Sequence, residues 1–222
     1  MNEWHHLDTA AGPVRAWFAR PLTPPRGSVI VLQEIFGVNA HIRAVTDGFA
    51  REGFVAMAPA LFDPVQPEVE LGYDDAGVIR GRELVTELGA DRALQVVAAA
   101  ARWLREANHR PGVVGYCWGG SIAFLANTRL RLPAVSYYGA RTMPYIAETA
   151  QAPLLFHFGG RDPSIPAEDI DRHRELQPQA GVFVYSAAGH AFNRDVDPRH
   201  FHAASAALAR ERTLAFLAEH TS

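Results

Sequence analysis

Short β-branched runs alternate with longer helical segments along most of this chain, and that alternation limits the folds open to it. A continuous apolar run of about five residues is typical of a strand buried on both faces, as in a parallel sheet. Such runs occupy residues 28–33 (SVIVLQ), 54–58 (FVAMA), 112–116 (GVVGY), 154–158 (LLFHF) and 182–186 (VFVYS). The pattern predicts an α/β protein with a mostly parallel central sheet and helices on both faces.

The segments between these strands have helical periodicity, and two weaker strands are expected at residues 14–19 and 134–138. We predict helices over residues 41–52, 79–88, 91–106, 121–127, 167–176 and 203–219. Gly89 separates the second from the third, and Gly53 follows the first as a C-cap. Because 222 residues without a repeat or long linker suit one core, we expect a single domain over residues 1–222.

Composition excludes several classes of protein. The net charge is −3 with no basic stripe, so neither nucleic acid nor an anionic membrane surface is an expected partner. The apolar runs are far shorter than the roughly 20 residues of a membrane span. The opening MNEWHHLDTA has no signal-peptide pattern, and a single cysteine cannot form an internal disulfide. We expect a cytoplasmic protein, either a monomer or a weak dimer.

The strand at residues 112–116 runs directly into Cys117, in the sequence Gly115-Tyr116-Cys117-Trp118-Gly119. This G-x-C-x-G pattern is typical of a nucleophile elbow, with cysteine in the place of serine. The small residues allow a strand and a helix to approach closely at a strained turn. The thiol then lies at a helix N-terminus, which favours the thiolate. The alternative is a buried structural cysteine beside a glycine-rich turn.

An acid and a histidine follow at later strand ends. Asp162 comes after the strand at residues 154–158, and His190 comes after the last strand. The order cysteine, aspartate, histidine is that of the α/β-hydrolase fold, in which the histidine is the general base and the aspartate orients it. Asp169 and Asp171 are rivals for the acid, but both lie on the next predicted helix. Among the other histidines, His41 and His173 are expected on surface helices, and His157 is expected as a core or shelf residue within a strand.

The loop after residues 28–33 contains a second acid, Glu34. This loop ordinarily supplies one oxyanion amide, here that of Ile35, and the other is expected from Trp118. Packing does not explain a carboxylate at this strand edge. Glu34 could accept the thiol proton or keep the thiol neutral until substrate arrives; the alternative is a solvated loop residue.

No metal site or cofactor is expected. His200 and His202 have the spacing of an H-x-H pair, but residues i and i+2 at a helix start do not share a face. Neither a cysteine nor a carboxylate cluster completes a ligand set around them.

Four motifs in register resemble the dienelactone hydrolases (carboxymethylenebutenolidases): QEIFGVN at 33–39, GYCWGG at 115–120, FHFGGRD at 156–162 and AGHAF at 188–192. The resemblance covers almost the whole chain. It implies that Cys117, Asp162 and His190 form a triad and that Glu34 activates the thiol. It also implies that Arg194 binds a substrate carboxylate and that Tyr138 lies near the pocket.

By this resemblance the chain opens the ring of a small, carboxylate-bearing lactone through an acyl-thioester. Two departures concern the substrate. Ala191 stands where the family often has serine, and the segment GYDDAGVIRGREL offers Arg80, Arg82 and Tyr73 as candidates for the carboxylate site. Two other functions are compatible with the sequence: a carboxylesterase or thioesterase acting on another small ester, and a non-catalytic, redox-responsive binding protein.

Overall fold

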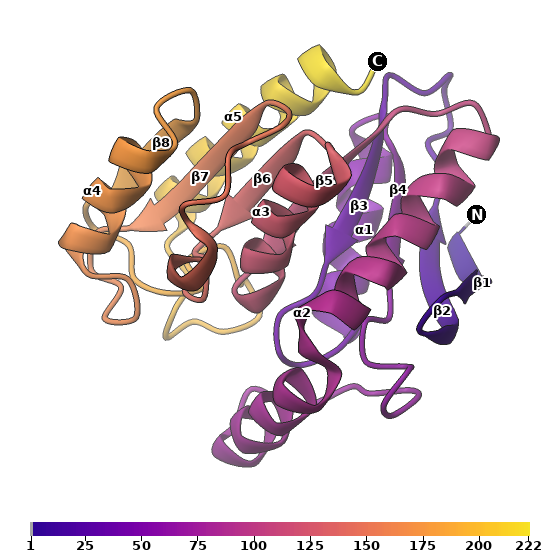
Figure 1. Ribbon diagram of the computed structural model, residues 1–222, viewed down its shortest axis with the longest axis horizontal. Helices are drawn as coiled ribbons and strands as arrows, with labels where there is room; N and C mark the ends of the chain where they lie inside the picture. Colours follow the sequence, from indigo (N-terminus) through magenta and orange to yellow (C-terminus); the bar gives the residue numbers. More distant parts are fainter. Residues whose placement is uncertain (1) are drawn as a thin grey trace.

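The computed structural model describes residues 2–222, which form an eight-stranded sheet in the order β1-β2-β4-β3-β5-β6-β7-β8 (Figure 1). The strands from β3 to β8 run parallel, and β1 and β2 add an antiparallel edge. The strands are β1 Asn2–Thr9, β2 Gly12–Ala19, β3 Ser28–Leu32, β4 Val55–Pro59, β5 Pro111–Tyr116, β6 Ala134–Tyr137, β7 Leu154–Gly159 and β8 Gly181–Tyr185. The predicted α/β-hydrolase fold, with a mostly parallel sheet, is confirmed.

Strand β1 was not predicted, because its polar sequence NEWHHLDT has few buried positions. It pairs with β2 through a hairpin in which Gly12 takes a φ of 117°. An edge strand needs only one partner and can remain polar on its outer side, so it lacks the apolar run that identified the central strands.

Helices cover both faces of the sheet (Figure 1). The helices are α1 Ala40–Arg51, α2 Asp75–Glu106, α3 Trp118–Leu130, α4 Ala167–Leu176 and α5 Ala203–His220, with a short 3₁₀ turn η1 at Met143–Tyr145. The long α2 is interrupted at Gly89, whose φ of 72° and ψ of 162° are not helical, as the glycine predicted. Gly53 has a φ of 91° just after α1, which confirms its capping role.

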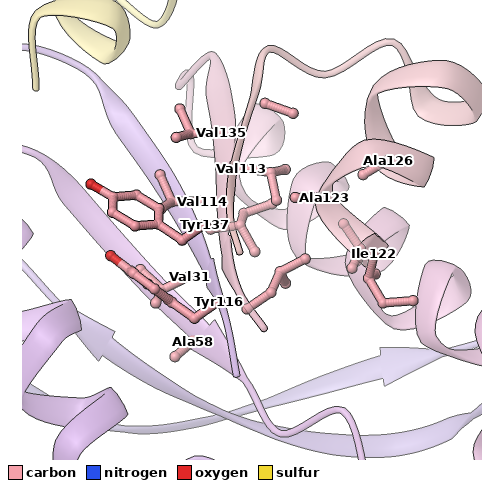
Figure 2. Close-up of a cluster of buried hydrophobic side chains, with 14 of the residues drawn as sticks. Val31, Ala58, Val113, Val114, Tyr116, Ile122, Ala123, Ala126, Val135 and Tyr137 are labelled. Carbon is pink, nitrogen blue, oxygen red and sulfur yellow. The ribbon is translucent and has the colours of Figure 1, made fainter. Parts of the chain in front are cut away.

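The central strands are buried on both faces. In Figure 2 the rings of Tyr116 and Tyr137 lie on one side of β5 and β6, whereas Ile122 and Ala123 of α3 pack against the other. Alternation along β5 therefore directs Tyr116 away from α3. The next residue, Cys117, leaves the strand at its carboxyl end.

Two histidines differ from their predicted environment. We expected His41 and His173 on surface helices; both lie on helices, α1 and α4, but their side chains are buried. His157 is a core residue of β7, as expected for a strand histidine. Within residues 2–222, no helix is both long enough and apolar enough to cross a bilayer.

Candidate active site

Cys117 lies at the sharp turn between β5 and α3, with φ 54° and ψ −119°. A non-glycine residue in this region of backbone space is strained, as the elbow pattern predicts. The flanking glycines make the turn possible. A Cβ at Gly115 would lie 1.9 Å from the carbonyl oxygen of Gly119, and one at Gly119 would lie 2.4 Å from that of Gln33. Cys117 is also the N-cap residue of α3, so its thiol lies at the positive end of a helix.

His190 connects the thiol to a buried carboxylate. Its Nε2 lies 3.2 Å from Sγ of Cys117, and its Nδ1 lies 2.7 Å from Oδ2 of Asp162. The second oxygen of Asp162 accepts the backbone amide of Ser164 at 2.8 Å. The structure thus brings together the three residues that the sequence predicted from three separate strand ends. The rivals Asp169 and Asp171 lie on α4, where the Asp171 carboxylate accepts from Arg174.

The charge on the imidazole depends on its two neighbours. Burial by itself would lower the pKa of His190, but the Cys117 thiolate and the Asp162 carboxylate outweigh burial and raise this pKa to about 10. A protonated imidazole between Cys117 and Asp162 is therefore favoured at neutral pH. A neighbouring imidazolium stabilises the thiolate, which is the nucleophilic form of a cysteine.

A cavity of about 570 Å³ opens over the thiol at the carboxyl edge of the sheet. Loops that follow β3, β5, β6, β7 and β8 converge on it, as expected for a parallel sheet. Ile35 and Trp118 both line this cavity, and Trp118 begins α3, where an amide has no partner within the helix. Other lining residues are Phe36, Tyr73, Asp74, Asp75, Val78, Arg82, Cys117, Ala140, Arg141, Pro163, Ser164, His190, Arg194, Asp197, Arg199 and His200.

Glu34 does not hydrogen-bond to the thiol in this structure. Its carboxylate is held by Arg194, with Nη2 to Oε1 at 2.8 Å and Nε to Oε2 at 3.2 Å. Both side chains are buried, and only Arg194 lines the catalytic cavity. The carboxylate is therefore a buried, ion-paired group and not a solvated loop group.

Arg194 has a second carboxylate partner and two aromatic neighbours. Its Nη1 lies 3.3 Å from Oδ2 of Asp197, and its guanidinium lies 4.3 Å from the ring centre of Tyr73 and 5.3 Å from that of Phe36. Burial would lower the pKa of Arg194, but the negative charge of Glu34 outweighs it and raises the pKa further. Arg194 is therefore a permanent cation at one wall of the cavity.

Sequence reasoning missed Asp197, which organises the cavity wall after β8. Besides Arg194, it accepts hydrogen bonds from Nδ1 of His200 at 2.8 Å and from Nε of Arg199 at 3.1 Å. These bonds outweigh burial and hold the pKa of Asp197 well below its usual value. A loop with several charged residues gave no signal to single out this one. His202, the other histidine of the H-x-H pair, caps α5 by accepting the amide of Ser205.

The two arginine candidates on α2 differ in whether they reach the cavity. Arg82 lines the catalytic cavity. Arg80 lies outside it, where its guanidinium donates to Glu83 at 2.8 Å and to Gln66 at 2.6 Å. Gly81 between them packs against the backbone of Ile35, so neighbouring side chains of α2 project to different sides. Tyr73, the third candidate, lines the cavity and its hydroxyl accepts from Asn39.

Tyr138 lies behind His190 rather than in the cavity wall. Its side chain is fully buried, its ring centre is 5.0 Å from that of His190, and its hydroxyl donates to Oδ1 of Asn193. It therefore connects the histidine to the loop that carries Arg194. Ala191, the residue after His190, is also buried and takes a φ of 58°. Because its side chain is a methyl group, this position has no hydroxyl that could hydrogen-bond beside His190.

Comparison with known proteins identifies the family of this chain. The chain matches the model of the "Dienelactone hydrolase family" over residues 14–221. It is 34% identical to the carboxymethylenebutenolidase of Pseudomonas putida over 211 residues, 89% of this chain and 88% of that one. It is 36% identical to the Escherichia coli K12 protein named "Putative carboxymethylenebutenolidase" over 221 residues, 90% of this chain and 80% of the relative.

A solved structure agrees over nearly the full length. The Klebsiella pneumoniae protein named "Putative Dienelactone Hydrolase" superposes with a TM-score of 0.87 at 29% identity and covers 99% of both chains. Together with the matched residues 14–221, these similarities extend from β2 to the end of α5. The chain belongs to the dienelactone hydrolase family and is a hydrolase that acts on carboxylic esters.

Proposed function

We propose that this enzyme opens the ring of a dienelactone-type, carboxylate-bearing lactone through an acyl-thioester on Cys117. The observation that carries the proposal is the position of His190, which lies 3.2 Å from the thiol and 2.7 Å from Asp162. Nucleophile, base and orienting acid are within hydrogen-bonding reach of one another, which is the geometry that covalent acyl transfer requires.

In the first step the sulfur of Cys117 attacks the lactone carbonyl, and the carbonyl electron pair moves onto its oxygen. The amides of Ile35 and Trp118 are the proposed donors to this oxyanion. Collapse of the intermediate breaks the ring carbon–oxygen bond. The leaving enolate stays attached to the acyl chain and takes a proton from the His190 imidazolium.

In the second step His190, now neutral, removes a proton from water, and the hydroxide attacks the thioester carbonyl. The carbon–sulfur bond breaks, the acid is released, and the thiolate returns beside the protonated imidazole. Asp162 holds the imidazole in the same orientation in both steps. The net reaction adds one water to the lactone.

Arg194 is the proposed contact for the substrate carboxylate, and its ion pair gives Glu34 a conditional role. A carboxylate that binds Arg194 competes with Glu34 for the same guanidinium. Release of Glu34 then places a free carboxylate at the end of β3, where it can accept a proton that remains on the thiol. Asp197 stays on Arg194 and keeps the guanidinium in position.

Arg82 is the second proposed anion contact, because it lines the cavity and makes no ion pair among residues 2–222. A free thiol nucleophile must also remain reduced, and the cytoplasm is the compartment that favours this state. We therefore place the reaction there.

Mass spectrometry during turnover tests the proposal. With a dienelactone as substrate, His190→Asn should accumulate an adduct on Cys117, because attack on the thiol ester by water lacks its base. Cys117→Ala should show neither adduct nor turnover while it remains folded, as judged by its circular dichroism spectrum. An adduct on any other residue, or near-wild-type turnover by Cys117→Ala, would refute the proposed nucleophile.

Substrate preference tests the ring-opening part of the proposal separately. The wild-type enzyme should have a higher kcat/KM for the dienelactone than for p-nitrophenyl acetate, which has no carboxylate for Arg194. A clear preference for p-nitrophenyl acetate would favour an esterase acting on a different small ester.

A further inference from the structure

A second cavity, of about 370 Å³, lies between α1 and α5 on the face of the sheet opposite α3. Small residues create the space: Ala44 and Gly48 on α1 face Ala203, Ala206 and Ala207 on α5. The loop after β8 separates this cavity from the catalytic one, since Asn193 lines the former and Arg194 the latter.

The floor of the second cavity contains a tyrosine hydroxyl that no described residue binds. Tyr116 and Tyr137 both line it, and Figure 2 shows their rings side by side with both hydroxyls pointing away from α3. The Tyr137 hydroxyl is bonded to Thr213 at 2.6 Å. Tyr116 is only 4% exposed as a residue, and within residues 2–222 its hydroxyl has no hydrogen-bond partner. The hydroxyl oxygen keeps some accessible surface, so it is open to the cavity and can donate to a molecule bound there.

The polar groups around this cavity that lack a partner among the described residues are predominantly donors. Arg210 uses only Nη2, in bonds to the Gly48 carbonyl and to Glu52, and within residues 2–222 its Nη1 and Nε have no partner. Arg51 at the rim forms no ion pair among the described residues. The Asp195 carboxylate is already paired with His41 at 3.3 Å and lies largely in solvent.

The remaining lining is apolar and partly aromatic. Val45, Phe49 and Phe201 line it together with the two tyrosine rings. Arg210 lies close enough to lower the pKa of Tyr116, although burial has the larger effect and raises it. The Arg210 guanidinium and the Tyr116 hydroxyl therefore both face this cavity, next to its apolar walls.

From the unpartnered Tyr116 hydroxyl, the unused Arg210 donors and the apolar walls, we infer that this cavity is a second binding site for a small aromatic carboxylate. The carboxylate accepts from Tyr116 and Arg210, and the ring lies between α1 and α5. This site is independent of the proposed lactone hydrolysis, because it contains neither the thiol nor its partners.

Benzoate is a suitable probe, with benzamide as its neutral counterpart. Cys117 is first alkylated with iodoacetamide to obstruct the catalytic cavity, and binding is followed by calorimetry and by ligand-observed NMR. We expect benzoate to bind with millimolar affinity and benzamide about 10-fold more weakly. No benzoate binding up to about 20 mM would overturn the inference.

Variants locate the bound probe. Ala206→Leu fills the cavity with a good helix former and should abolish binding, whereas Tyr116→Phe and Arg210→Gln should each weaken it about 10-fold. Arg82→Gln, in the catalytic cavity, is the matched control and should leave it unchanged. If Ala206→Leu does not fold, Ala207→Leu replaces it. Binding that survives the filling variant, or that is lost in Arg82→Gln, would place benzoate elsewhere and overturn the inference.

Discussion

Glu34 and Arg194 form a two-point ion pair in which both side chains are buried, with nitrogen–oxygen distances of 2.8 and 3.2 Å. Removing one member of a buried pair leaves the other charge without compensation, which costs more than loss of an exposed pair. We expect the pair to have two effects that experiments can separate: it stabilises the loop after β3, and it occupies the Glu34 carboxylate so that this group does not accept a proton until substrate displaces it.

Glu34→Gln should reveal both effects. The amide cannot neutralise Arg194, although Asp197 still does so in part, and we expect the free energy of unfolding to fall by about 1–3 kcal/mol. Acylation should slow while deacylation is unchanged, as measured by rapid mixing with the carboxylate-bearing dienelactone, whose carboxylate releases Glu34 from Arg194. Glu83→Gln, which removes the exposed partner of Arg80, is the control and should change stability by less than about 0.5 kcal/mol. A defect in deacylation alone would contradict the proposed role of Glu34.

The His190 imidazole should titrate far above an ordinary histidine. Its pKa of about 10 in the folded protein exceeds the value of about 6.5 expected when the chain is unfolded. The folded state therefore binds an extra proton between these values. Its stabilising contribution is complete below about pH 6.5 and is lost as the pH rises through about 10. NMR titration of the ring protons, together with urea unfolding at several pH values, measures both quantities.

Cys117→Ala tests the cause of this shift. In this variant only the Asp162 carboxylate remains to raise the pKa of His190, while burial still lowers it. The pKa of His190 should therefore fall. The pH dependence of unfolding at alkaline pH should weaken in parallel. An unchanged His190 titration in this variant would show that the thiolate does not raise the pKa.

Arg82→Gln and Arg80→Gln are a matched pair on one helix. Arg82 lines the catalytic cavity, so its loss should raise KM about 10-fold for a carboxylate-bearing lactone and leave KM for p-nitrophenyl acetate unchanged. Arg80 is occupied by Glu83 and Gln66 outside the cavity, so Arg80→Gln should have little effect on either substrate. If both variants raised KM equally, the cause would be the net charge of α2, and the specific role of Arg82 would be contradicted.

Tyr138→Phe tests whether Tyr138 positions the catalytic histidine. The change keeps the ring beside His190 but leaves Oδ1 of Asn193 without its donor, so we expect a loss of about 1–2 kcal/mol in stability and a several-fold lower kcat with KM nearly unchanged. Asn193→Ala should have a similar effect, and the double variant should be little worse than either single one. Additive losses would indicate that the two residues act separately.

Most of the fold and the central triad could be predicted from the sequence because both depend on local patterns. Apolar runs identified the central strands, and Gly115 and Gly119 identified the turn that their backbones must make. Strand β1 escaped prediction because its pairing with β2, not its own hydrophobicity, determines it. His41 and His173 were misplaced because helix periodicity does not show how deeply a helix packs.

The surroundings of the triad depended on contacts between distant segments. The sequence alone determined that Cys117, Asp162 and His190 follow strands of one parallel sheet, whose carboxyl ends must meet at one edge. Only the tertiary structure decided that Glu34 pairs with Arg194, 160 residues away, and that Arg82 rather than Arg80 faces the cavity. The positions of strands along the chain are encoded by short-range hydrophobic periodicity, whereas the partner of a buried charge depends on which side chains long-range packing brings within a few ångströms.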